Sequence, residues 1–230
     1  MGDGSPCGPV TAGTIGVSSR FALTYVDFSG AFLRLIRPAD TTIVWPQGPD
    51  VTGQFNFIAD NMTGDWLWIM GDDHVFEATL LIDLLALDLD VVVPLCLKKQ
   101  APFEPVVYRG VERDEDGRNW YQPAVLPQSG VCEVHAAGSA GMLIRKRVLD
   151  ELPRPIFQTT GAQQDEDLVL CEKIRDAGFK IHCSVDQRLG HLGFFGVYPM
   201  WQGDRYGTYL DLGNGQGTPL FAFEPGEEVA

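Results

Sequence analysis

The sequence predicts an α/β protein with a mainly parallel central sheet flanked by helices and a small antiparallel insertion. Three observations support this class. Strand-like apolar runs alternate with helical patterns through the first hundred residues, which favours parallel strands joined by right-handed crossovers. Residues 66–70 are apolar throughout, as in a strand buried on both faces. The length of 230 residues suits one large α/β domain or two small ones.

The first half of the chain supplies most of the regular pattern. Strands are expected at residues 14–17, 41–45, 66–72 and 91–97. A helix capped by Ser18 or Ser19 is expected to end before Pro38. A short helix is expected over residues 54–62. Leucines at helical spacing predict another over residues 77–87.

The second half is less regular. Prolines and an acidic turn in residues 98–134 indicate a hairpin-bearing insertion. A strand at residues 142–144 and a short helix ending at Pro153 follow. Residues 166–177 predict a helix with Gly178 at its C-terminal cap, and the alternation after it predicts a strand over residues 179–185. The Gly- and aromatic-rich stretch from Gly190 carries no strong period.

Composition restricts the function classes. The net charge is −14 with a pI near 4.5, which argues against a broad nucleic-acid-binding surface. Basic residues cluster only locally, at 98–99 and 145–147. The five dispersed cysteines favour reduced thiols, and neither a signal peptide nor a membrane span is visible. We therefore expect a cytoplasmic protein.

The first candidate site is Asp72-Asp73-His74, directly after the buried strand. Side chains at the carboxyl end of such a strand lie at the edge of an open α/β sheet where ligands bind. Two carboxylates and an imidazole can hold a divalent cation there, and such a cation commonly holds phosphate. The alternative is an ordinary turn, because aspartates often follow strands.

The second candidate is the acidic run Asp165-Glu166-Asp167 at the start of a predicted helix. Acidic residues in a first turn favour the helix dipole, so capping is one interpretation. Three adjacent carboxylates exceed what capping needs, and their repulsion raises at least one pKa. A carboxylate with a raised pKa suits a general base that deprotonates a hydroxyl.

Two glycine-containing segments complete the candidate set. His191 stands between Gly190 and Gly193 just after the last predicted strand, so it can fall on the same sheet edge as Asp73. The bend from Gly138 to Gly141 is either a plain turn or a place where a sugar lies against the backbone. P-loop, dinucleotide-binding and serine-hydrolase motifs do not occur in the sequence.

These segments, in this order, resemble the GT-A class of nucleotide-sugar glycosyltransferases, especially family 2 and its relatives. The match covers roughly residues 14–193 and is most specific over residues 65–76 and 166–179. The resemblance implies a single GT-A (Rossmann-like) domain over residues 1–230. Residues 14–97 would form the nucleotide-binding half, residues 98–193 the donor-sugar and acceptor half, and residues 194–230 a tail or lid.

The resemblance also implies roles for the acidic residues and the late histidine. Asp73 matches the carboxylate that binds Mn²⁺ or Mg²⁺ on the donor diphosphate, and Asp72 matches the neighbouring acid facing the ribose or the metal's water shell. His191 matches a late histidine that completes the metal site. Asp167 matches the general base of inverting members, with Glu166 beside it.

Further positions match segments that bind the donor. Val17, Ser18 and Asn56 correspond to segments that hold the nucleotide, and Gly138 and Gly141 to the strand beside the donor sugar. The implied donor is a UDP- or GDP-sugar. The implied acceptor is a hydroxyl of a saccharide, of a small molecule or of a hydroxymethylated base in DNA.

Two departures from the family pattern leave alternatives open. Gly71 replaces the first acid of a literal D-x-D, so His74 could serve as the partner of Asp72 in a D-x-H arrangement. Asn56 lacks the arginine that usually accompanies it. A catalytically silent nucleotide-sugar binding protein and a metal-independent glycoside hydrolase using Asp73 and Asp167 are the rival functions.

Overall fold

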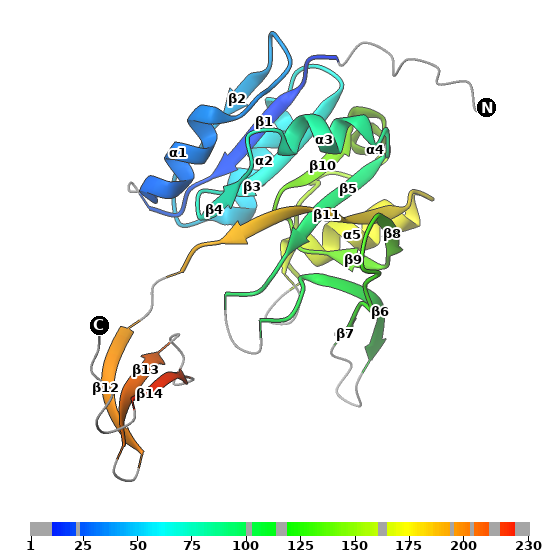
Figure 1. The fold of residues 1–230 in the computed structure, drawn as a ribbon. Helices are drawn as coiled ribbons and strands as arrows, with labels where there is room; N and C mark the ends of the chain where they lie inside the picture. Colours follow the sequence, from blue (N-terminus) through cyan, green and yellow to red (C-terminus); the bar gives the residue numbers. More distant parts are fainter. Residues whose placement is uncertain are drawn as a thin grey trace, which may run out of the picture.

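The computed structural model describes residues 11–21, 24–99, 103–113, 119–160, 165–193, 196–202, 205–211 and 217–223. Its main feature is an eight-stranded sheet in the order β2-β1-β3-β10-β5-β11-β4, with β8 paired to β11 (Figure 1). The strands of this sheet are β1 (Thr14–Ser18), β2 (Thr42–Val44), β3 (Trp66–Gly71), β4 (His74–Phe76), β5 (Val91–Cys96), β8 (Val131–Val134), β10 (Met142–Arg145) and β11 (Ile181–His191).

The pairings confirm the predicted mainly parallel α/β class. Strands β2, β1, β3, β5 and β11 run in one direction, while β10, β4 and β8 oppose them. The reversed strand β10 lies between β3 and β5, so it joins the two parallel groups through antiparallel ladders. The carboxyl ends of the five co-directional strands therefore lie along one edge of the sheet.

Helices cover both faces of this sheet (Figure 1). They are α1 (Val26–Arg34), α2 (Val51–Asp60), α3 (Leu80–Ala86), α4 (Lys146–Glu151) and α5 (Glu166–Asp176). Alternation along β3 divides the core. Trp66, Trp68 and Met70 pack with α1 and α3, while Leu67 and Ile69 pack with α2, α4 and α5. Because both faces are covered, β3 is apolar along its length, as the sequence predicted.

Two smaller sheets accompany the main one. The predicted hairpin insertion is confirmed as β6 (Val107–Arg113) and β7 (Asn119–Pro123), with β9 (Ala136–Ala137) paired to β6. Towards the C-terminus, β12 (Gly196–Gln202), β13 (Arg205–Asp211) and β14 (Gly217–Phe223) form an antiparallel sheet. The sequence did not predict these three strands, since their glycines weaken the alternation.

The first helix begins later than predicted. Ser19 does not cap a helix, because its backbone N–H donates to Gln54 Oε1 at 3.0 Å and to the Pro46 carbonyl at 3.3 Å. These bonds hold the chain extended beyond β1, and α1 begins only at Val26. The cap of α2 was also missed: Asp50 accepts a hydrogen bond from the Gly53 N–H at 2.9 Å.

Two other boundaries matter for the site. His74, predicted only to follow the buried strand, begins the short reversed strand β4. Strand β11 continues past the predicted residue 185 as far as His191. Among the described residues, no helix combines the length and the apolar character that crossing a membrane requires.

Candidate active site

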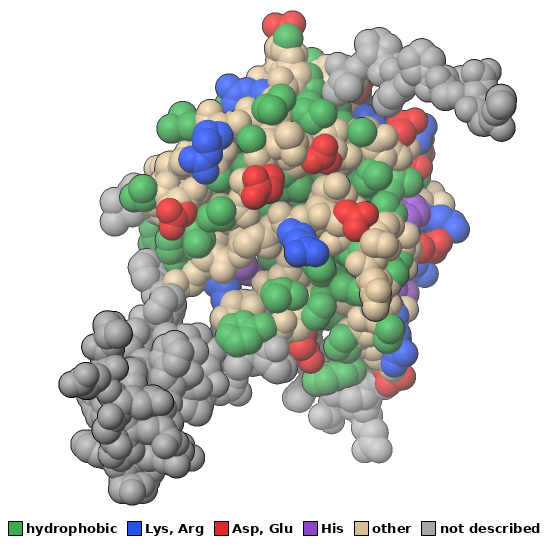
Figure 2. Space-filling view, in the orientation of Figure 1, with side chains coloured by type: hydrophobic (Ala, Val, Ile, Leu, Met, Phe, Trp, Pro, Cys, Tyr) green, Lys and Arg blue, Asp and Glu red, His purple; other side chains and the backbone are tan. Residues whose placement is uncertain are grey.

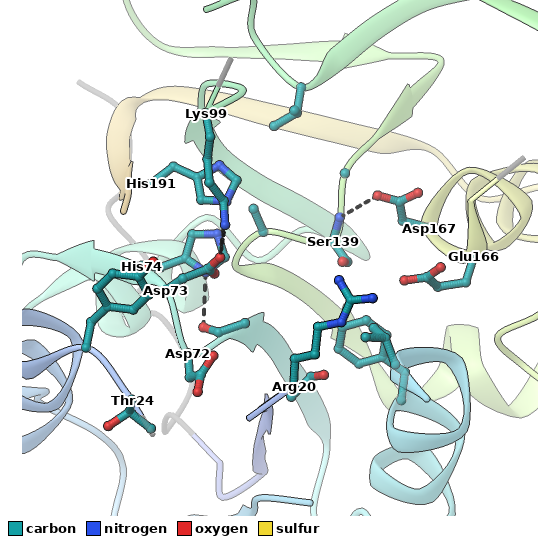
Figure 3. Close-up of a pocket in the computed structure, with 18 of the residues that line it drawn as sticks. Arg20, Thr24, Asp72, Asp73, His74, Lys99, Ser139, Glu166, Asp167 and His191 are labelled. Carbon is teal, nitrogen blue, oxygen red and sulfur yellow. Dashed lines mark hydrogen bonds and ion pairs between the residues drawn. The ribbon is translucent and has the colours of Figure 1, made fainter. Parts of the chain in front are cut away.

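A cavity of about 840 Å³ opens where β1 and β3 end. It has the size of a ligand site and collects residues from segments far apart in the sequence (Figure 3). Its lining consists of Ser18, Arg20, Phe21, Thr24, Tyr25, Val51, Phe55, Gly71, Asp72, Asp73, His74, Lys99, Val106, Gly138, Ser139, Ala140, Glu166, Asp167 and His191. Residues of both predicted acid clusters and the predicted late histidine therefore share one cavity.

Strand pairing brings the two histidines together. In the antiparallel ladder of β4 and β11, His191 lies directly opposite His74. Their rings stack with centroids 4.7 Å apart, and the Leu192 N–H donates to the Asp73 carbonyl at 2.7 Å. The register of two short strands thus fixes the distance between the first acid cluster and the late histidine.

Both imidazoles are oriented by backbone carbonyls. Nδ1 of His74 lies 3.1 Å from the Gly71 carbonyl oxygen, and Nδ1 of His191 lies 2.9 Å from that of Leu97. A donor Nδ1–H in each ring leaves Nε2 with a free lone pair, the arrangement found in metal-binding histidines. Nε2 of His74 is buried and has no hydrogen-bond partner among the described residues.

Asp73 stands at the centre of the polar group. Its carboxylate contacts Lys99 Nζ, and its Oδ2 lies 3.6 Å from His191 Nε2. Burial opposes ionisation, but the neighbouring basic side chains of His191, His74 and Lys99 outweigh it and hold the pKa of Asp73 below its usual value. Asp73 is therefore an anion that a cation already neutralises.

A steric contact explains the glycine at position 71, and the sequence alone did not reveal it. A Cβ at this position would lie 2.7 Å from Asp73 Oδ1. An aspartate at the first position of a literal D-x-D would displace the carboxylate that lies here. Asp72 differs from Asp73: burial raises its pKa, partly countered by a hydrogen bond with Ser19.

Asp167 lies at the other end of the cavity, on the first turn of α5. Its Oδ2 accepts a hydrogen bond from the Ser139 N–H at 3.3 Å, and its Oδ1 accepts one from the Leu168 N–H at 2.8 Å. Burial, followed by the like charges of Glu166 and Asp165, raises the pKa of Asp167 to about 7. The carboxyl can therefore exchange a proton near neutral pH.

Part of the cavity lining is apolar and aromatic. Phe21, Tyr25, Val51 and Phe55 line it, and Phe21 is 69% exposed. Arg20 extends into the same region (Figure 3). Flat apolar side chains beside a guanidinium suit a planar ring that carries a charged group.

Three residues predicted to bind the donor do not line the cavity. Val17 is fully buried in the core. Asn56 donates to the Phe157 carbonyl at 2.8 Å and accepts from the Phe157 N–H at 3.0 Å, so its amide holds a neighbouring loop. Gly141 occupies a turn with φ of 68°, where a Cβ would meet Pro94 at 2.9 Å. Ser18, Asp72 and Gly138 do line the cavity.

The backbone of Gly138 borders Asp167. A Cβ on Gly138 would lie 3.4 Å from Asp167 Oδ2, so a side chain there would crowd the carboxylate. The bend at residues 138–141 thus keeps space around Asp167 and supplies the Ser139 N–H.

Sequence reasoning missed several lining residues. Arg20, Thr24 and Tyr25 belong to no motif, because loops bring them to the cavity, and Ser139 lies inside the predicted bend at residues 138–141 without having been singled out. Lys99 carried a signal, since it follows the buried strand β5. It belongs to one of two local basic clusters of the sequence, at residues 98–99 and 145–147.

The second of these clusters lies elsewhere in the fold. Arg145 pairs with Trp66 at the start of β3, the end opposite to Asp72, and its guanidinium lies 3.2 Å from Asp88. Arg147 pairs with Asp90. On the face drawn in Figure 2, basic side chains are dispersed among acidic and apolar ones.

No family model matches the chain, and no curated protein matches it. Among solved structures, the crystal structure of GalNAc-T7 with UDP, GalNAc and Mn²⁺ matches with a TM-score of 0.55 at 13% identity. The match covers 84% of this chain but only 45% of that chain. A197 from STIV matches with a TM-score of 0.48 at 15% identity, over 83% of this chain and 98% of that one. The first likeness supports a GT-A-like fold.

Proposed function

We propose that this protein is a metal-dependent glycosyltransferase. It would move a sugar from a UDP- or GDP-sugar to a hydroxyl acceptor with inversion at the sugar carbon. The observation that carries the proposal is the content of one cavity: a histidine–aspartate cluster at one end and a carboxyl with a pKa of about 7 at the other. The GT-A-like fold and the UDP, GalNAc and Mn²⁺ of the matching structure support it.

The residues present fit a divalent ion. Asp73 and His191 would hold Mn²⁺ or Mg²⁺, and the unpartnered Nε2 of His74 offers a further donor. Asp72, beside them, would face the ribose or the metal's water shell. The bound ion would stabilise the charge that develops on the departing nucleoside diphosphate.

Lys99 would have a second electrostatic role. Its ammonium group contacts Asp73, so it neutralises the carboxylate that the ion would otherwise neutralise. Once an ion binds Asp73, we expect the ammonium group to turn to a diphosphate oxygen. A cation there strengthens charge-assisted contacts with the leaving group.

Asp167 would act as the general base. The acceptor hydroxyl would give its proton to the Asp167 carboxylate as its oxygen attacks the sugar carbon. A base with a pKa near the working pH is efficient for this step. Glu166 would support it by raising the proton affinity of Asp167 through like charge.

Aromatic side chains of the lining would hold the nucleotide base. Tyr25 and Phe21 would stack on the base, and Ser18 would bond to the nucleoside. We assign no role in this contact to Val17 or Asn56. The whole chain is proposed as one catalytic unit, with residues 14–97 binding the nucleotide and residues 98–193 binding the sugar and acceptor. The segment 194–230 is proposed as a tail or lid.

A transfer assay tests the function. UDP- and GDP-sugars are incubated with saccharide, small-molecule and hydroxymethylated-DNA acceptors, with and without EDTA, and product anomers are read by NMR. Metal-dependent transfer with inversion is the expected result. Nucleotide-independent cleavage of a glycoside that survives EDTA would instead identify a glycoside hydrolase. Tight donor binding without turnover on any acceptor would identify a silent binding protein.

A further inference from the structure

We propose that Cys96 joins His74 and His191 in a thiol-containing metal site that favours Zn²⁺ or Co²⁺ over Mg²⁺. The inference concerns the metal ion of the proposed transferase. It rests on the proposed function for one point, namely that the bound ion would contact a nucleotide. Cys96 is the last residue of β5, which pairs with β11 so that Cys96 lies opposite Leu189. The cysteine and both histidines therefore come from three neighbouring strands of one sheet.

The geometry of the three donors fits a metal ion. One ring nitrogen of each histidine and Cys96 Sγ all lie within 4.8 Å of one another. Tetrahedral bonds of about 2.0 Å to nitrogen and about 2.3 Å to sulfur place donor atoms about 3.5 Å apart, so the side chains would have to close by up to roughly 1 Å around an ion. Asp73 Oδ2, 3.6 Å from His191 Nε2, is available as a fourth donor.

A second observation separates this cluster from an ordinary buried cysteine. Nε2 of His74 is buried without a partner among the described residues, and such a nitrogen is costly unless something binds it. Its Nδ1 is already engaged by the Gly71 carbonyl. The Leu97 carbonyl lies 2.9 Å from His191 Nδ1 and also accepts a hydrogen bond from Cys96 Sγ at 3.6 Å. One backbone group thus orients two of the three donors.

The donor types determine the metal preference. Thiolate and imidazole ligands suit zinc and cobalt, while magnesium prefers oxygen ligands. A site made of Asp73 and one histidine would accept Mn²⁺ or Mg²⁺. A site that includes Cys96 and both histidines ranks Zn²⁺ and Co²⁺ above Mn²⁺, and Mn²⁺ above Mg²⁺.

Metal binding to the chelator-treated full-length protein tests the proposal without any turnover. Co²⁺ alone is added and the near-ultraviolet absorption is recorded, because a thiolate on Co²⁺ gives a charge-transfer band. The band is expected in the wild type and in Cys132→Ser, and it is expected to be lost in Cys96→Ser. Cys132 is a matched control, since its free thiol lies half-buried on β8 outside the cluster.

Equilibrium dialysis with Zn²⁺ and Mn²⁺ gives the second readout. Cys96→Ser is expected to weaken Zn²⁺ binding about tenfold or more, while Mn²⁺ binding changes much less. If that variant does not fold, X-ray absorption of the zinc-loaded wild type counts sulfur ligands directly. A cobalt spectrum without the band, equal Zn²⁺ affinity in the variant, or zinc without a sulfur neighbour would each overturn the proposal.

The results also separate this inference from the proposed function. If nucleotide binding depends on Mn²⁺ but the cobalt complex lacks the thiolate band, Cys96 is not a metal ligand and the proposed function is retained. If the thiolate band is present but the protein binds no nucleotide, the proposed metal site is supported and the proposed transferase function is rejected. Absence of any metal binding would overturn both.

Discussion

His191 lies directly opposite His74 in the antiparallel pair of β4 and β11, and the two rings stack with centroids 4.7 Å apart. A short reversed strand that follows Asp72-Asp73 is what makes this contact. Each ring is oriented through its Nδ1 by a backbone carbonyl, so Nε2 of His74 is left without a partner among the described residues and Nε2 of His191 faces Asp73 at 3.6 Å. The proposed metal centre therefore depends on strand register as much as on the acidic motif.

Replacing Asp167 tests the proposed base. Asp167→Asn keeps the size of the side chain but cannot accept the acceptor's proton, so we expect kcat to fall at least about 100-fold. Nucleoside diphosphate affinity should stay within about twofold, since Asp167 lies at the opposite end of the cavity from Asp73. The measurement pairs an initial-rate assay with calorimetric titration. Near-normal turnover would remove Asp167 from the mechanism.

The same substitution should alter the pH dependence of stability. The folded-state pKa of Asp167, about 7, exceeds the unfolded value of 3.8, so the folded state binds the proton more tightly. Asp167 therefore contributes most favourably to the free energy of unfolding at low pH, and this contribution is lost as pH rises from about 4 through 7. At pH 8 the desolvated charge destabilises the fold.

We accordingly expect Asp167→Asn to raise the free energy of unfolding at pH 8 by on the order of 1–2 kcal/mol relative to wild type. The gain should shrink towards zero at pH 4. Urea unfolding at both pH values measures it, with Asp176→Asn as the control because Asp176 is an exposed residue of the same helix. A gain that does not change with pH would contradict the account.

Replacing Lys99 should change metal-ion affinity and nucleoside diphosphate affinity in opposite directions. Lys99→Met removes the ammonium group from Asp73, so a divalent ion alone should bind severalfold more tightly. Nucleoside diphosphate should bind about tenfold more weakly, because a charge-assisted contact is lost. Calorimetry measures both affinities. In the control Lys98→Met, the lost ammonium group instead faces Glu104 at 2.8 Å, outside the cavity lining, and neither affinity should move.

Gly71 tests the steric account of the acidic motif. In Gly71→Ala the new Cβ would press on Asp73 Oδ1, so we expect about tenfold weaker metal binding with little loss of stability. Gly110→Ala is the control, because its Cβ would meet nothing nearer than 3.9 Å. Equal metal affinity in Gly71→Ala and wild type would show that Asp73 can shift without consequence.

Much of the fold could be predicted because its signals are local. The apolar run of β3 and the capped helix α5, with Gly178 at φ of 86°, depend on neighbouring residues only. The late start of α1 could not be predicted, since a distant Gln54 side chain holds Ser19 extended.

The residues of the candidate site also fall into those that local sequence predicts and those that it does not. Asp73, His191 and Asp167 were found from short segments, and all three line one cavity. Lys99 and Cys96 could not be placed from sequence, because the strand order that sets β5 beside β11 is a long-range property. Their roles, like those of the predicted site residues, are proposals that the variants above test.

Thermal stabilisation by nucleoside diphosphates, with and without Mn²⁺, tests the central proposal most directly. A ligand that binds only the folded state at 100 times its Kd stabilises it by about 2.7 kcal/mol. We predict a rise in melting temperature with UDP or GDP that requires Mn²⁺ and disappears in Asp73→Asn, while Asp27→Asn on α1 behaves as wild type. No rise with any nucleoside diphosphate, at any Mn²⁺ concentration, would contradict the proposed donor site and with it the glycosyltransferase.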